Sequence, residues 1–183
     1  MKVAEDIYAY VWQGNDNNCN SYIFGNTLTG NKHILIDPGH IVTPFLHEPA
    51  FEKLSQQIQK DGLKLEDIGL IVLTHAHPDH VEAAPRVQLV SRAAIALHKQ
   101  DEEMFRHFNA GKVDYYLDEG ELALDGLVKD KLQVYHTPGH SPGQIALYWP
   151  DRKALAVGDD IFYHNTGRVD LPGGSPAQLK QSL

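Results

Sequence analysis

Alternating apolar and polar positions divide the chain into short strands and a few helices. Strand-like apolar runs cover residues 7–12, 21–24 and 33–36, and polar or turn-forming residues separate them. Because these runs are short and closely spaced, we expect the fold to open with antiparallel strands. Residues 48–61 then predict a helix, with apolar side chains on one face and Gly62 at its end.

The rest of the chain continues the same mixture of strands and helices. Four uninterrupted aliphatic residues, 70–73, predict a buried strand. Further strands are expected at residues 94–97, 121–124, 132–136, 144–149 and 154–157. Helices are expected at residues 81–91, with Pro85 in the first turn, and at residues 99–108. The pattern predicts an α+β fold.

Three histidines and an aspartate follow the central strand. His75 and His77 are two residues apart, so in an extended segment their side chains leave the same side of the backbone. Pro78 ends the strand, and Asp79 is expected to cap a short helix that begins near His80. Polar groups packed this tightly are costly to bury unless they are paired, and a metal ion pairs them. Neutral imidazole suits zinc and iron, so we predict a metal site here.

Two later strands also run into potential metal ligands. Residues 132–136 lead into a rigid turn that presents His140, and residues 154–157 lead into Asp159. If these strands lie side by side, their loops meet the central histidines at one edge of a sheet.

Composition narrows the class of protein. The 183 residues, 42% of them hydrophobic, suit a single domain spanning residues 1–183. A net charge of −8 without a basic block argues against nucleic acid or an anionic membrane surface as partner. Cys19 is the one cysteine, so no internal disulfide is expected, and the N-terminus lacks the apolar core of a signal peptide. We expect a cytoplasmic protein that acts on a small-molecule substrate; the oligomeric state is left open.

Four motifs together resemble the metallo-β-lactamase superfamily. Residues 75–80 (HAHPDH) match its HxHxDH motif, and residues 137–143 (TPGHSPG) resemble its TPGHxxG motif. Residues 158–162 (GDDIF) resemble GDxLF, and residues 167–174 (GRVDLPGG) are similar to the GRxDxPGG run of glyoxalase II-like members. The resemblance implies a four-layer αββα sandwich, in which two mixed sheets face each other with helices outside.

The resemblance also implies two metal positions. The first metal would be bound by His75, His77 and His140. The second would be bound by Asp79, His80 and Asp159, with Asp159 bridging both ions. One or two zinc ions are expected, and iron is an alternative. Asp79 is also the expected catalytic residue, because it would orient a metal-bound hydroxide.

Several activities share these ligands. The resemblance favours a glyoxalase II-like hydrolase that cleaves a thioester such as an S-acyl glutathione. The alternative is a non-haem iron persulfide dioxygenase, with iron bound by His75, His140 and Asp159. A second alternative is an inactive, metal-binding homologue that serves as a binding module. The proline and two glycines at residues 172–174 favour the hydrolase, and Asp159 argues against antibiotic hydrolysis.

Four further residues outside the ligand motifs have expected roles. Arg168 and Asp170 are expected to form a structural ion pair, and binding of substrate by Arg168 is a sharper alternative. Tyr163 follows the metal loop and is a candidate pocket residue. Glu82 stands near the position where the family usually has glycine, and we expect a solvated side chain there, although it could also alter the polarity around the site.

The family completes its second metal site with a histidine beyond the helix that follows GRxD. Here Ser175 and Pro176 predict the start of that helix, and the sequence ends at Leu183. We therefore expect the C-terminal part of the fold to be truncated. We also expect weaker occupancy of the second metal position and poor affinity for glutathione.

Overall fold

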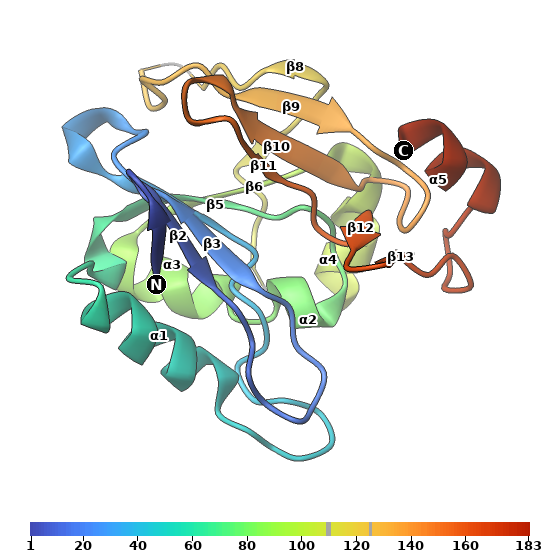
Figure 1. Cartoon of the computed structure of the whole chain (residues 1–183), viewed down its shortest axis with the longest axis horizontal. Coiled ribbons are helices and arrows are strands. Elements are labelled where there is room, and N and C mark those ends of the chain that lie inside the picture. The colour runs from blue at the N-terminus through green and yellow to red at the C-terminus, as the bar shows by residue number, and fades with distance from the viewer. Residues whose placement is uncertain (109–110, 125) are drawn as a thin grey trace.

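The computed structural model describes residues 1–108, 111–124 and 126–183, and its strands form two main sheets and one hairpin (Figure 1). The first sheet has seven strands in chain order: β1 Lys2–Ala4, β2 Ile7–Tyr10, β3 Ser21–Phe24, β4 His33–Ile36, β5 Ile68–Val72, β6 Ala94–Leu97 and β7 Tyr115–Tyr116. The second sheet has the order β11-β10-β9-β8: β8 Gly120–Glu121, β9 Gln133–His136, β10 Ile145–Trp149 and β11 Ala154–Ala156. The hairpin consists of β12 Ile161–Phe162 and β13 Asn165–Thr166.

The direction of the strands changes at β4. Strands β1 to β4 pair antiparallel, which confirms the expected opening. From β4 to β7 the pairing is parallel. Parallel neighbours need a crossover connection, and helices supply it between β4 and β6. The carboxyl ends of β4, β5 and β6 therefore lie at one edge of the sheet.

Five α-helices accompany the sheets within the described ranges: α1 Ala50–Lys60, α2 Pro78–Val81, α3 Ala84–Ser91, α4 Glu102–Phe108 and α5 Pro176–Ser182. The helix predicted at residues 81–91 is confirmed over residues 84–91, with Pro85 in its first turn, but its predicted start is wrong because a turn at residues 82–83 separates α2 from α3. Pro85 has no N–H, and its ring would collide with the carbonyl of Val81 in a continuous helix. None of the helices in the described ranges is long and apolar enough to cross a membrane.

Two hydrophobic layers hold these elements together. Between the sheets, side chains of β4 and β5 such as Ile34 and Leu70 pack against Leu147 and Trp149 of β10. On the opposite face of the seven-stranded sheet, Leu35 and its neighbours pack against α1, α3 and α4. Alternate residues of a strand point to opposite faces, so the continuous apolar runs of β4 and β5 fill both layers.

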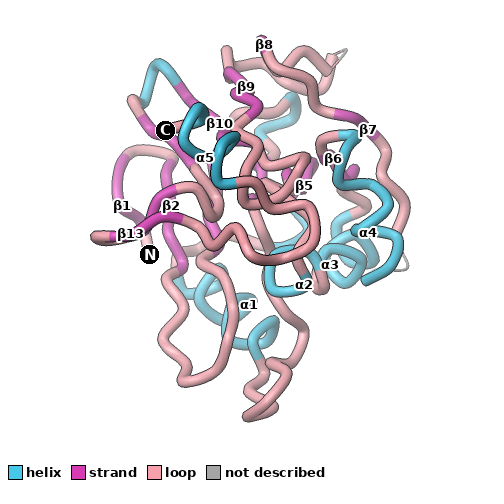
Figure 2. The backbone as a smooth tube through the Cα atoms, turned by 90° about the vertical axis from the view of Figure 1, so that its right-hand side faces the viewer, coloured by secondary structure: helices cyan, strands magenta, loops and turns pink. Residues whose placement is uncertain are grey.

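The fourth layer consists of α5 among the described residues. Ser175 caps this helix as predicted, because its hydroxyl accepts a hydrogen bond from the backbone N–H of Gln178 at 3.3 Å. Helix α5 lies at the end of β9 and β10 (Figures 1 and 2), where Ser182 donates a hydrogen bond to the carbonyl of Pro138. The two facing sheets with helices outside confirm the expected sandwich, but only the first sheet is mixed, because all strand pairs of the second sheet are antiparallel.

Candidate metal centre

The loops that carry the expected ligands meet at one edge of the two sheets. His75 and His77 follow β5 of the first sheet, and His140 lies in the turn between β9 and β10 of the second. Asp159 follows β11, and Gly158 before it has a φ of 53°. A side chain at Gly158 would collide with the hydroxyl of Thr74, at 2.5 Å from the Cβ position. Glycine therefore allows the Asp159 loop to reach the histidines.

A first group of donors consists of His75, His77 and His140, all of them buried. The Nδ1 of His77 lies 2.8 Å from the Nε2 of His140, which lies 3.2 Å from the Nε2 of His75. Nitrogens that bind one zinc ion at ~2.0–2.1 Å in a tetrahedron lie about 3.3 Å apart. The three nitrogens therefore have the spacing of ligands to one ion.

Hydrogen bonds on the far side of two imidazoles show which nitrogens face the centre. His140 donates its Nδ1–H to the carbonyl of Arg168 at 2.8 Å, and the Nδ1 of His75 lies 3.0 Å from the hydroxyl of Thr74. With a proton assigned to the Nδ1 of each ring, the Nε2 lone pairs of both rings face inward. Buried lone pairs that face one another are unfavourable without a cation between them, so this donor set fits zinc or iron.

A second group of donors lies beside the first and consists of His75, His80 and Asp159. One carboxylate oxygen of Asp159 lies 3.2 Å from the Nε2 of His80, and the other lies 3.4 Å from the Nε2 of His140. One carboxylate thus faces a ligand of each group. A carboxylate in this position suits the bridging role that the sequence motif implies.

Asp37 orients the histidines of both groups from behind. Its carboxylate accepts hydrogen bonds from the backbone N–H and the hydroxyl of Thr74, at 2.8 and 2.7 Å, and lies 2.9 Å from the Nδ1 of His80. The sequence indicated only a turn at Asp37. Its position directly after a buried strand, like that of the histidines after β5, was the one available signal.

Asp101 joins the two loops that carry the first group. Its carboxylate accepts hydrogen bonds from the N–H of Ala76 at 3.0 Å, the hydroxyl of Ser141 at 2.7 Å and the N–H of Gly143 at 2.6 Å. Only 1% of its surface is exposed. The sequence placed Asp101 in a helix and gave no sign of this role, because its partners lie 25 to 42 residues away.

Burial and neighbouring charges prepare the imidazoles for metal. Burial, with the positive charge of neighbouring histidines, lowers the pKa of His75 and brings the pKa of His77 to about 4. Both rings are therefore neutral ligands at pH 7. Burial alone would also lower the pKa of His80, but the carboxylates of Asp37 and Asp159 raise this pKa well above its usual value. A metal ion at its Nε2 would take the place of that proton.

The structure places Asp79 beside these groups, but not in either of them. Asp79 lies in the first turn of α2 and does not cap it, because Pro78 begins the helix. Its carboxylate accepts a hydrogen bond from the amide of Asn17 at 3.1 Å. Asp79 and His80 nevertheless line the same cleft, together with Asp159.

The remaining candidate residues lie outside the two donor groups. Tyr163 lines the cleft and is 91% exposed. Arg168 pairs with Asp170 through two hydrogen bonds of 2.7 Å, so the expected ion pair is present. Glu82 is not simply solvated, because its carboxylate lies 2.5 Å from the Nδ1 of buried His40.

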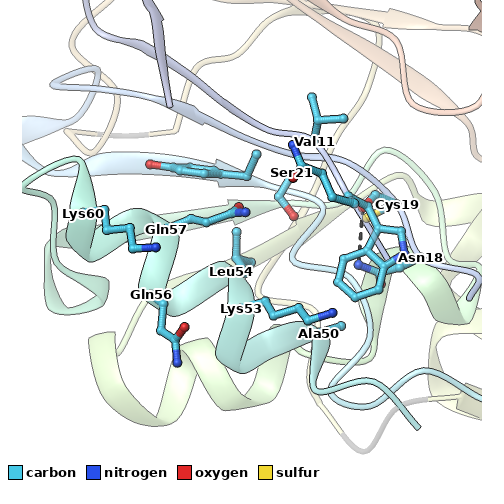
Figure 3. A pocket seen from close by; sticks show the side chains of 13 residues that line it. Val11, Asn18, Cys19, Ser21, Ala50, Lys53, Leu54, Gln56, Gln57 and Lys60 are labelled. Carbon is cyan, nitrogen blue, oxygen red and sulfur yellow. Dashed lines mark hydrogen bonds between the residues drawn. The ribbon is translucent and has the colours of Figure 1, made fainter. Parts of the chain in front are cut away.

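Two cavities border the centre and a third lies apart. The cleft that contains Asp79 and Asp159 has a volume of about 360 Å³ and is lined by polar residues of the loop before β3 on one side and by residues 155–163 on another. A larger groove of about 920 Å³ opens beside His77. The third cavity, of about 320 Å³, lies between α1 and the strands β2 and β3, and none of the six expected ligands lines it (Figure 3).

Comparisons with known proteins agree with this geometry. A model of the Metallo-beta-lactamase superfamily matches residues 14–183. A probable metallo-hydrolase of Methanocaldococcus jannaschii is 30% identical over 177 residues, covering 90% of this chain and 77% of that protein. The hydroxyacylglutathione hydrolase GloC of Haemophilus influenzae is 32% identical over 166 residues, covering 81% of this chain and 70% of that protein.

Solved structures show the same fold. The crystal structure of TTHA1623 in a di-iron-bound form has a TM-score of 0.72 at 33% identity, and the match covers 93% of this chain and 81% of that one. The BLEG-1 B3 metallo-beta-lactamase has a TM-score of 0.74 at 27% identity, covering 96% and 82%. With the motif histidines gathered at one centre that could hold a metal ion, the chain belongs to the metallo-beta-lactamase superfamily.

Proposed function

We propose that the protein hydrolyses thioesters, with an S-acyl derivative of a small thiol such as glutathione as substrate. The observation that carries this proposal is the position of Asp159, whose two oxygens face His80 and His140 at 3.2 and 3.4 Å. One carboxylate can then serve two cations, an arrangement suited to hydrolysis. The naming of several relatives as hydroxyacylglutathione hydrolases supports the choice of a thioester.

The metal would be held by His75, His77 and His140 in the first position, and by His80, Asp159 and Asp79 in the second. When bound, zinc or iron lowers the pKa of a coordinated water to about 7 and polarises a carbonyl group. In this proposal Asp79 orients the attacking water and takes up its proton. The amide of Asn17 donates to the carboxylate of Asp79 and keeps it directed into the cleft.

A second activity, persulfide oxidation, remains a candidate. His75, His140 and Asp159 together offer two imidazoles and one carboxylate, a ligand set that suits non-haem iron. The carboxylate of Asp159 lies 3.4 Å from the Nε2 of His140. A relative with a similar fold binds two iron ions. The metal itself, zinc or iron, is therefore part of the proposal to be tested.

An oxygen electrode separates the two activities. The purified protein, loaded with zinc in one sample and with iron in another, is given S-acetyl glutathione and then glutathione persulfide. We expect thiol release from the thioester without oxygen uptake. Oxygen uptake with the persulfide, without thioester hydrolysis, would replace our proposal with the dioxygenase.

His140→Ala is the inactive reference for this experiment, and His164→Ala is the matched control, because His164 is exposed and lies in the β12–β13 hairpin. If the native protein binds metal but turns over neither substrate, the chain is a metal-binding module and the hydrolase proposal fails.

A further inference from the structure

The groove of about 920 Å³ adjoins the first donor group at His77. Its lining residues come largely from helix α4 and from the segment that precedes α5; Figures 1 and 2 show where these two segments lie. Six of its lining residues carry the argument: His77, Pro78, Met104, Phe108, Pro142 and Leu171. Two of these are a candidate metal ligand and the residue that follows it, so the groove runs directly into the centre.

The two openings of the centre differ in chemistry. Amides and carboxylates such as Asn17 and Asp79 line part of the smaller cleft, and apolar residues such as Leu155 line the rest. Most of the groove surface beside His77 is apolar and comes from residues such as Met104 and Leu171. Its ionisable lining residues, such as Glu103 and Arg106, are exposed, and Arg106 already pairs with Glu102. A polar substrate group would therefore gain little binding free energy in the groove, whereas the transfer of an apolar substrate group from water into the groove would be favourable.

We propose that this groove binds the acyl chain of the substrate, and that the substrate is a thioester with an apolar acyl group. This inference rests on the proposed thioester hydrolysis. A thioester whose carbonyl lies at the centre would place its acyl chain between Met104 and Leu171. Its polar thiol half would occupy the cleft around Asn17. The groove has the volume of a small-molecule site.

The proposal predicts a dependence on chain length. With zinc-loaded protein, kcat/KM is measured for S-acyl glutathiones with acetyl, butyryl, hexanoyl and octanoyl groups. Each buried methylene should raise kcat/KM by about twofold to fourfold. S-lactoyl glutathione, with its short polar acyl group, should be a poorer substrate than the hexanoyl compound.

Variants test whether the groove causes that dependence. Leu171→Asn keeps the size of the side chain and removes its apolar character, and Phe108→Ser removes a ring that is 45% exposed. Both should lower the ratio of kcat/KM for the octanoyl compound to kcat/KM for the acetyl compound by about fivefold or more. Leu89→Asn is the control, because Leu89 is 78% exposed on α3 and lies outside the groove. This variant should keep the native ratio.

The failure of this inference can be told apart from the failure of the proposed function. If all acyl lengths react equally, or if Leu171→Asn and Leu89→Asn give the same ratio, thioester hydrolysis stands and the groove assignment falls. If no thioester reacts, the proposed function falls, and calorimetric titration with octanoate and acetate decides the groove. Octanoate binding that is at least tenfold tighter than acetate binding, and that is lost in Leu171→Asn, would support the groove; equal binding would overturn it.

Discussion

At the scale of single residues, two carboxylates beside the centre have different surroundings. Asp37 is buried and accepts hydrogen bonds from Thr74, the residue directly before His75. Asp79 is partly exposed, lines the cleft and has the amide of Asn17 as a partner. The first arrangement holds ligands in place, and the second keeps a carboxylate in the cleft, where the proposed function requires it to act on a water molecule.

The change Asp79→Asn should therefore harm turnover far more than folding. An amide keeps the shape of the side chain but can neither take up a proton nor supply negative charge. We expect kcat for thioester hydrolysis to fall by about 100-fold or more, while the midpoint of urea unfolding changes little. An Asp79→Asn protein with native turnover would contradict the proposed role of Asp79.

Residue types decide which parts of the site can be read from the sequence. His75, His77, His140 and Asp159 carry ligand atoms at motif spacings, and the structure brings them together. Asp37 looks like any other turn residue in the sequence. Its partners Thr74 and His80 are 37 and 43 positions away, so only the folded chain reveals it.

Among the elements of the fold, Asp101 connects loops from both sheets. Its replacement should therefore lower the affinity for metal. The change Asp101→Asn puts an amide N–H against a donor of Ala76, Ser141 or Gly143 and so disturbs both loops. We expect zinc affinity to fall by about 10- to 100-fold in competition with a chelator.

Asp114→Asn is the control for Asp101, because Asp114 also accepts a backbone N–H, that of Ile95 at 2.9 Å, but belongs to neither metal-binding loop. Equal zinc affinities of the Asp101 and Asp114 variants would show that Asp101 does not position the ligands.

His33, the first residue of β4, should make the stability of the fold depend on pH. The Nδ1 of His33 accepts the N–H of Asn26 at 3.0 Å, and burial lowers the pKa of His33, although Asp67 and Asp6 act against this shift. Above about pH 6.5 a histidine with a lowered folded-state pKa is neutral in both the folded and the unfolded chain, so it costs no stability there. Below that pH the unfolded chain takes up a proton that the folded chain resists.

His33 should therefore contribute to a fall in the free energy of unfolding as the pH drops below about 6.5. His33→Asn should reduce this fall, because the amide oxygen still accepts the N–H of Asn26 but does not titrate. Urea unfolding at several pH values measures it. His164→Asn, at an exposed position, should keep the native slope. Identical slopes for native protein and His33→Asn would count against this explanation.

Element types were more predictable than element ends. The runs at β3, β4 and β6 have the expected bounds, because each consists of apolar residues preceded by at most one polar residue. Strand β2 stops at Tyr10 instead of residue 12, since the N–H of Trp12 turns to the side chain of Asn20. This side-chain contact competes with strand pairing and leaves no periodic signal in the sequence.

At the scale of the whole molecule, the fold brings ligands from two sheets to one edge. The antiparallel opening could be expected from the order of runs, and the pair of sheets from the family resemblance. The cleft and the groove beside the centre could not, because the groove forms between α4 and the segment before α5, and the cleft forms between the loop before β3 and residues 155–163.

A metal centre at His75, His77 and His140 is tested by the metal content of protein purified without added metal, compared with that of His140→Ala and His164→Ala. We expect on the order of one zinc or iron ion or more per chain in the native protein and in His164→Ala. His140→Ala should retain less than about a tenth of that amount and should lose thioester hydrolysis with it. Full metal occupancy in His140→Ala, or a native protein that binds no zinc or iron even when these are supplied, would show that these histidines do not form a metal centre.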